Sequence, residues 1–132
     1  MIQIVYISTA RGDAHVERGN ILLTSRRNND RDGISGLLYD DGVRFLQVLE
    51  GDEGRVDAAF ARIKADPRHR AVVILSRRPI EAREFGDWAM ASLTPGVEAS
   101  EVMARVGLLV AGASDNVRAT FESFARVRRA AA

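Results

Sequence analysis

The chain has 132 residues, 46% of them hydrophobic, and this length and composition predict one globular domain with a core of its own. Its 19 basic and 18 acidic residues leave a net charge of +1, which favours neither a nucleic-acid-binding surface nor an acidic tail, so no direct nucleic-acid partner is expected. The sequence has no cysteine, which excludes disulfides and thiol chemistry, and its two separated histidines predict no metal site. It has neither a signal-like N-terminus nor an apolar stretch long enough to cross a bilayer, so we expect a cytoplasmic protein without a membrane partner.

The first half of the chain predicts a strand, a helix and a hairpin. Residues 2–8 put largely apolar side chains on both faces of a strand, as in the middle of a sheet. A helix follows and ends near Asn29. Strands over 34–39 and 43–50 then flank Asp40-Asp41-Gly42, a strong hairpin signal.

The second half predicts a helix and a strand, then an additional strand and a helical tail. Apolar residues from Val56 to Ile63 recur at helical spacing in a helix over 51–65, which Pro67 ends. The remaining predicted elements are a strand over 71–76, a polar connection over 77–87, a strand over 88–93 and helices over 100–111 and 114–129.

This order of elements is the split βαβ pattern of ferredoxin-like α+β folds, with one extra strand and a C-terminal two-helix tail. Two helices are expected to cover one face of the sheet. We divide the chain into a domain over 1–94 and a helical extension over 95–132, whose amphipathic helices must bury their apolar stripes on the other sheet face or in a homo-oligomer. We expect no second, catalytic domain, because the extension is too short to be one.

A glutamine on an apolar strand face is the most informative position in the sequence. Gln47 shares its face with Val43, Phe45 and Leu49, and a buried amide without partners costs roughly 1–3 kcal/mol, so either the core or a polar ligand satisfies it. The first and third strands of a split βαβ fold are commonly central, which makes Tyr6 and Gln47 neighbours. Other polar residues at core-like positions of the first strand and first helix are Ser8, Ser25 and Asn29.

Together these side chains suggest a slot for a flat heteroaromatic ligand, with Asn29 and Gln47 reading two of its edges. No glycine-rich phosphate loop, GxSxG elbow or close carboxylate pair accompanies them. Two alternatives stay open on the same fold. One is an acylphosphatase-like hydrolase, for which residues 9–13 offer a single arginine, and the other is a colourless ligand-binding or dimerisation module.

Taken singly, the residues have ordinary structural interpretations. Arg62 and Asp66 have the i, i+4 spacing of a surface ion pair, and Trp88 and Met90 are typical core residues. Six spaced motifs in the correct order favour a common function instead. They are Tyr6-Ile7-Ser8, Ser25-Arg26-Arg27-Asn28-Asn29, Gly33-Ile34-Ser35-Gly36-Leu37-Leu38-Tyr39, Phe45-Leu46-Gln47-Val48-Leu49-Glu50-Gly51, Asp66-Pro67-Arg68-His69 and Phe85-Gly86-Asp87-Trp88-Ala89-Met90.

Through these motifs, residues 1 to about 94 resemble the BLUF domains, flavin-binding sensors of blue light. The resemblance implies non-covalent FAD, with Tyr6 as electron and proton donor to the excited flavin and Gln47 as the bridge between them. It also implies that Asn29, with Asn28 beside it, bonds the flavin carbonyl edge, and we place Ser25 in the same pocket.

The resemblance further implies a cofactor tail site and a relay for the signal. Arg62, Asp66 and His69 match positions near the ribityl and phosphate part of FAD. Trp88 and Met90 match the pair linked to signalling, and we assign Ser8 to the same relay. The implied function is a photosensor rather than an enzyme. A reversible hydrogen-bond change would then pass to a downstream protein partner whose identity is unknown.

Overall fold

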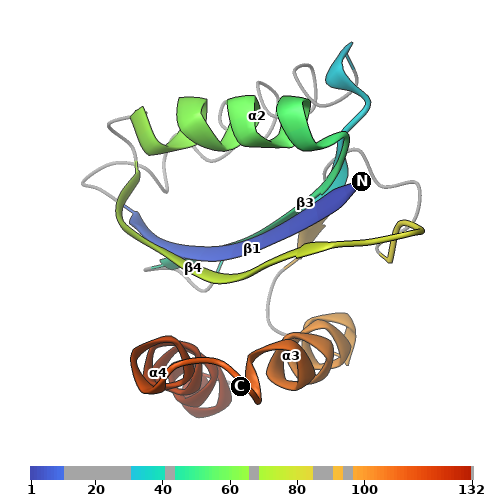
Figure 1. Cartoon of the computed structure of the whole chain (residues 1–132). Coiled ribbons are helices and arrows are strands. Elements are labelled where there is room, and N and C mark those ends of the chain that lie inside the picture. The colour runs from blue at the N-terminus through green and yellow to red at the C-terminus, as the bar shows by residue number, and fades with distance from the viewer. Residues whose placement is uncertain (11–30, 41–43, 66–68, 85–90, 94–96, 132) are drawn as a thin grey trace.

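The computed structural model describes residues 1–10, 31–40, 44–65, 69–84, 91–93 and 97–131. Labels follow Figure 1. The described strands are β1 Ile2–Ala10, β2 Ser35–Asp40, β3 Arg44–Gly51, β4 His69–Pro79 and β5 Ala91–Leu93. The described helices are α2 Glu53–Ala65, α3 Val97–Val110 and α4 Asp115–Ala131.

The five described strands form one sheet in the order β4-β1-β3-β2-β5. The strands β1 and β3 are antiparallel neighbours inside the sheet, β4 and β2 flank them, and β5 runs parallel to β2 at the far edge. This arrangement confirms the predicted ferredoxin-like α+β fold. It also explains why both faces of β1 are apolar, since a strand inside a sheet with helices on both faces exposes neither of them.

Helices cover the two faces of the sheet separately, with α2 on one face and α3 and α4 on the other (Figure 1). Alternation along β1 divides the core accordingly: Ile2, Ile4 and Tyr6 join the cluster beneath α2, whereas Val5 and Ile7 join the cluster beneath the tail helices. The tail contributes Val102, Met103, Val106, Val110, Phe121 and Phe124 to that second cluster. Its apolar stripes are therefore buried on the sheet within a single chain.

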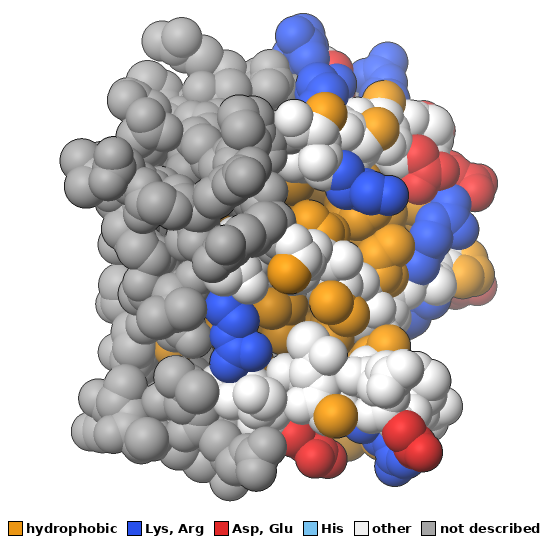
Figure 2. All heavy atoms as spheres, turned by 90° about the vertical axis from the view of Figure 1, so that its left-hand side faces the viewer, with side chains coloured by type: hydrophobic (Ala, Val, Ile, Leu, Met, Phe, Trp, Pro, Cys, Tyr) orange, Lys and Arg blue, Asp and Glu red, His pale blue; other side chains and the backbone are white. Residues whose placement is uncertain are grey.

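Hydrophobic side chains are visible between the helices and the sheet when the molecule is viewed from one end (Figure 2). Figure 2 shows hydrophobic side chains in the centre of this face, with most of the charged side chains around them. Among the described residues, no helix combines the length and hydropathy needed to cross a membrane.

The strand β4 is longer than predicted. We expected it over 71–76, with a polar connection from Arg77 onward, but it extends from His69 to Pro79. The prediction was wrong because β4 lies at the sheet edge, where arginines reach solvent without leaving the ladder. Proline is likewise tolerated there because an edge strand has a side that no other strand pairs with.

One glycine sets how closely β2 approaches β3. A Cβ at Gly36 would lie 1.8 Å from the carbonyl oxygen of Val48, so only glycine fits at this point. Val48 directly follows Gln47, so the close approach of Gly36 to Val48 helps to hold the register of β3, the strand that carries Gln47.

Candidate functional site

Tyr6 and Gln47 stand directly opposite each other on β1 and β3. Tyr6 is 0% exposed and Gln47 is 3% exposed. Alternation puts Gln47 on the same face as Phe45 and Leu49, whose cluster also contains Tyr6 and lies beneath α2. The expected proximity of the two residues on the helix-covered face is confirmed, while their functional roles stay predictions.

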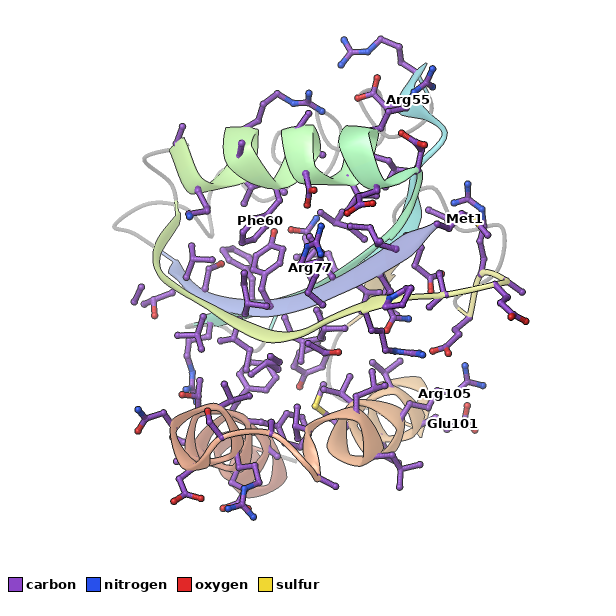
Figure 3. All side chains as sticks on the ribbon, viewed as in Figure 1. Met1, Arg55, Phe60, Arg77, Glu101 and Arg105 are labelled. Atoms are coloured by element: carbon purple, nitrogen blue, oxygen red, sulfur yellow. The ribbon has the colours of Figure 1, made fainter. Side chains whose placement is uncertain are left out.

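The ring of Tyr6 is held from above by α2. Phe60 points from this helix toward the sheet (Figure 3), and its ring centroid lies 5.1 Å from that of Tyr6 at an interplanar angle of 63°. This edge-to-face geometry is favourable for aromatic pairs and limits the tilt of the phenol. Lys64, one helical turn further on, places its ammonium 5.7 Å from the Phe60 centroid. The α2 helix thus orients the tyrosine.

The predicted cofactor-tail residue Arg62 forms an ion pair across the structure. Its guanidinium lies 3.0 Å from Asp32 Oδ2, and Arg31 Nε lies 3.0 Å from Asp32 Oδ1. Hydrogen bonding from Arg31, assisted by Arg62, holds the pKa of the Asp32 carboxyl below its usual range. Asp66, the i, i+4 partner weighed from the sequence, lies outside the described residues. The Arg62–Asp32 contact ties α2 to the residues just before β2.

The structure places two further predicted residues. Ser8 is buried on β1, opposite Phe45 and two residues after Tyr6, so it shares the face of Tyr6. His69 is the first residue of β4 and pairs with Ala10 of β1. The other predicted site residues, Ser25, Asn28, Asn29, Asp66, Trp88 and Met90, lie outside the described residues and stay predictions.

Sequence reasoning missed a buried polar pair on the opposite face of the same two strands. Gln3 of β1 stands opposite Glu50 of β3, both are 0% exposed, and Gln3 Nε2 donates a 2.8 Å hydrogen bond to Glu50 Oε2. The signal was available, because Gln3 breaks an apolar strand pattern as Gln47 does.

Chemically, the α2 face offers a phenol beside a carboxamide within apolar surroundings. Either group can donate or accept a hydrogen bond, and neither carries a formal charge at neutral pH. Such a pair suits recognition of a planar ligand with carbonyl and ring-nitrogen edges, and proton exchange with it. Within the described part of the chain, no group of three or more His, Asp or Glu side chains could hold a metal ion.

Comparison with known families places residues 1–91 in one of them. The matching family model is BLUF, described as sensors of blue-light using FAD. Among curated proteins, the photoactivated adenylate cyclase subunit beta of Euglena gracilis is 43% identical over 58 residues, which is 44% of this chain and 7% of that protein. The subunit alpha of the same organism is 40% identical over 62 residues, or 47% of this chain and 6% of that one.

Solved structures give longer matches. The dark-state structure of BlrB, a BLUF protein, superposes with a TM-score of 0.70 at 30% identity and covers 99% of this chain and 96% of that one. The photo-activated state of BlsA gives a TM-score of 0.71 at 26% identity over 91% and 90% of the two chains. A bacterial light-regulated adenylyl cyclase gives 0.68 at 28% identity, with 85% of this chain matching 34% of that one.

Proposed function

Because the chain belongs to the BLUF family of blue-light sensors that use FAD, we propose that it binds FAD non-covalently on the α2 face of its sheet and senses light through Tyr6 and Gln47. The observation that carries the proposal is the direct pairing of these two buried residues on β1 and β3. Their neutral polar groups, set in an apolar cluster, fit the carbonyl and ring-nitrogen edges of a flavin.

A bound flavin would supply the absorption of blue light and the capacity to accept an electron. Tyr6 gives up an electron and its hydroxyl proton and later takes both back, so the cycle leaves no net oxidation. Gln47 relays the proton and exchanges its donor and acceptor ends by rotation or tautomerisation. Two hydrogen-bond arrangements of one side chain then define a dark and a signalling state.

Other residues are proposed to hold the rest of the cofactor. Ser25, Asn28 and Asn29 would bind the flavin ring, and Asp66 and His69 would lie near its ribityl and phosphate part. Arg62 would assist them, and its ion pair with Asp32 keeps its guanidinium beside the start of β2. FAD is favoured by the family description, although one solved relative, Klebsiella pneumoniae BlrP1, is described as a complex with FMN.

We propose that the output passes to a separate protein partner, relayed through Ser8, Trp88 and Met90. The curated relatives are named as adenylate cyclases, but the match covers only 7% of the first of them, so cyclase activity is not carried over. Homo-oligomerisation stays a prediction, to be tested by comparing molecular mass in darkness and in light. A hydrolase is not favoured, because the family matched is one of light sensors.

Absorption spectroscopy tests the proposal. The purified protein reconstituted with FAD is expected to absorb blue light and to shift reversibly to the red on illumination. Tyr6→Phe and Gln47→Leu should abolish this shift while flavin remains bound. Tyr39→Phe is the matched control, since Tyr39 is also 0% exposed but lies on the opposite face of the sheet. Failure to bind any flavin, or a full red shift in Tyr6→Phe, would contradict the assignment.

A further inference from the structure

A set of charged and polar residues holds the end of β4 and the turn after it against the sheet. We call this set the Glu50 cluster. It comes from β1, β3, β4 and the residues that follow β4, and its members are Gln3, Glu50, Arg78, Arg83 and Glu84. Gln3 and Glu50 lie on the sheet face that α3 and α4 cover, since they alternate with Ile4 and Leu49 of the α2 face.

Glu84 is the centre of the first group of bonds. Its backbone N–H donates to Glu50 Oε2 at 3.0 Å, and its carboxylate accepts from Gln3 Nε2 at 3.1 Å and from Arg78. Gln3 makes two further hydrogen bonds in this group. Its Oε1 accepts from Arg78 Nε at 3.2 Å, and its Nε2 donates to Glu50. The amide at position 3 therefore connects two carboxylates and a guanidinium.

Arg83 forms the second group of bonds. Its guanidinium donates to the Glu50 carbonyl at 2.8 Å, to Ser35 Oγ at 2.6 Å and to the Gly33 carbonyl at 2.6 Å. It thereby joins the end of β3 to the start of β2. The planar fork of arginine suits three fixed acceptors, whereas a lysine ammonium is a compact point charge that cannot reproduce this pattern.

The cluster is also connected to the tail. Arg105 of α3 donates to the Glu84 carbonyl at 3.2 Å. Figure 3 shows Arg105 on the side of α3 away from α4. Two features of the chain make this link informative. Glu84 comes just before the residues that lead into β5, and the strands that carry Gln3 and Glu50 carry Tyr6 and Gln47 three positions along.

Stability alone is a weak reason for such a cluster. Removing the Glu50 carboxylate from water carries a desolvation penalty that attraction to its partners often fails to exceed, and water screens the partly exposed Arg78–Glu84 ion pair. A polar network instead defines one particular arrangement of the groups it joins. Here the joined groups are the two strands of the light-sensing pair, the connection to β5 and helix α3.

We propose that the Glu50 cluster is the link through which a change at Tyr6 and Gln47 reaches α3, with Arg83 and Glu50 as positioning residues. The proposal rests on the photoreceptor function proposed above. A change in β1 or β3 alters the positions of Gln3 and Glu50, these move the backbone of Glu84, and Arg105 transmits that movement to α3.

Hydrogen exchange of the full, FAD-loaded chain tests the link, measured in darkness and under continuous blue light in peptides covering α3. The unmodified protein should show a light-minus-dark difference there. Arg83→Lys and Arg105→Gln should reduce that difference about fivefold, the ratio that corresponds to the net contribution of one hydrogen bond, with the flavin red shift unchanged. Arg77→Lys is the matched control and should preserve both readouts, because its acceptors Glu53 and Asp57 lie on α2.

The outcomes separate the two proposals. No red shift in the unmodified protein contradicts the photoreceptor function. A normal red shift with no difference in α3, or a difference that both variants retain, overturns the link alone. Arg105→Gln serves where Arg83→Lys fails to fold, because Arg105 is exposed and its bond is to the backbone of Glu84. Loss of the red shift in Arg105→Gln would also overturn the link, since it would place the cluster in the light reaction itself.

Discussion

The two faces of the sheet each carry one buried polar pair on the same two strands, and the pairs differ in kind. Beneath α2, Tyr6 and Gln47 are neutral groups in an apolar cluster. Beneath the tail helices, Gln3 and Glu50 belong to a network that includes arginines and a second carboxylate. The difference teaches that burial of a polar group has two uses here. Neutral groups such as a phenol and an amide can exchange donor and acceptor roles, whereas charged groups bonded within the protein fix one arrangement.

Large-to-small substitutions in the two faces should separate folding from light sensing most clearly. Phe124→Ala is expected to reduce the free energy of unfolding by about 4 kcal/mol and Phe60→Ala by about 3 kcal/mol, because truncation leaves a cavity. Phe124 has the larger effect since it is 0% exposed whereas Phe60 is 8% exposed; both rings make one aromatic and one cation contact. Urea unfolding measures both losses. Only Phe60→Ala should change the flavin spectrum, so equal spectral effects would contradict the division between the faces.

Gly36→Ala should disturb both faces at once. The added methyl would meet the Val48 carbonyl, and the required backbone shift is expected to cost about 2–3 kcal/mol of unfolding free energy. Because Val48 follows Gln47, the flavin spectrum should change as well. Gly112→Ala is the control, since a Cβ there meets nothing within 4 Å, and it should change the stability by less than about 0.5 kcal/mol. Unaltered stability in Gly36→Ala would show that β2 and β3 can separate without cost.

Acid should weaken the Glu50 cluster through Glu84. Hydrogen bonding from Arg78, with smaller contributions from Gln3 and Arg105, holds the pKa of Glu84 below its ordinary value of 4.5. A lowered folded-state pKa contributes stability that is fully present above the unfolded value and is lost as the pH falls through the folded value. Since the Glu84 side chain is 41% exposed and water screens its ion pair, the effect is expected to stay below about 1 kcal/mol.

Urea unfolding at about pH 6 and about pH 3.5 measures this effect, with Glu84→Gln as the comparison, because that variant lacks the titrating group. The unmodified protein should lose more stability on acidification than Glu84→Gln does. An equal loss in the two proteins would contradict the assignment.

The smallest effect is expected at the exposed ion pairs of α2. Arg77 donates to Glu53 and to Asp57, both at 3.0 Å, and all three side chains are at least 42% exposed. Screening by water limits such contacts, so Glu53→Gln should change the stability by less than about 1 kcal/mol and leave the spectrum unaltered. Measurement at low and high salt checks the origin of the effect, since a contribution from charge should decrease with salt. A loss above that bound, unaffected by salt, would show that α2 depends on Glu53 for packing.

The sheet and the pairing of Tyr6 with Gln47 were predictable from the sequence, because periodicity two and a recognised order of elements place β1 beside β3. Contacts between distant segments were not. The bond between Gln3 and Glu84 joins residues 81 positions apart, and Arg62 pairs with Asp32, which lies 30 positions away in the sequence. Local spacing identifies only neighbours along one helix or strand. For the same reason the end of β4 was misplaced, since its arginines look like a loop until the strand is known to lie at an edge.

The parallel pairing of β5 with β2 limits the positions that β5 can take. Its three residues pair in parallel with Leu37, Leu38 and Tyr39, whose side chains alternate between the two faces. A slip of one residue along β2 would pair each residue of β5 with a β2 residue of the opposite face, and intermediate positions would break the backbone hydrogen bonds between the two strands. We therefore expect β5 to change its position on β2 by whole residues rather than continuously.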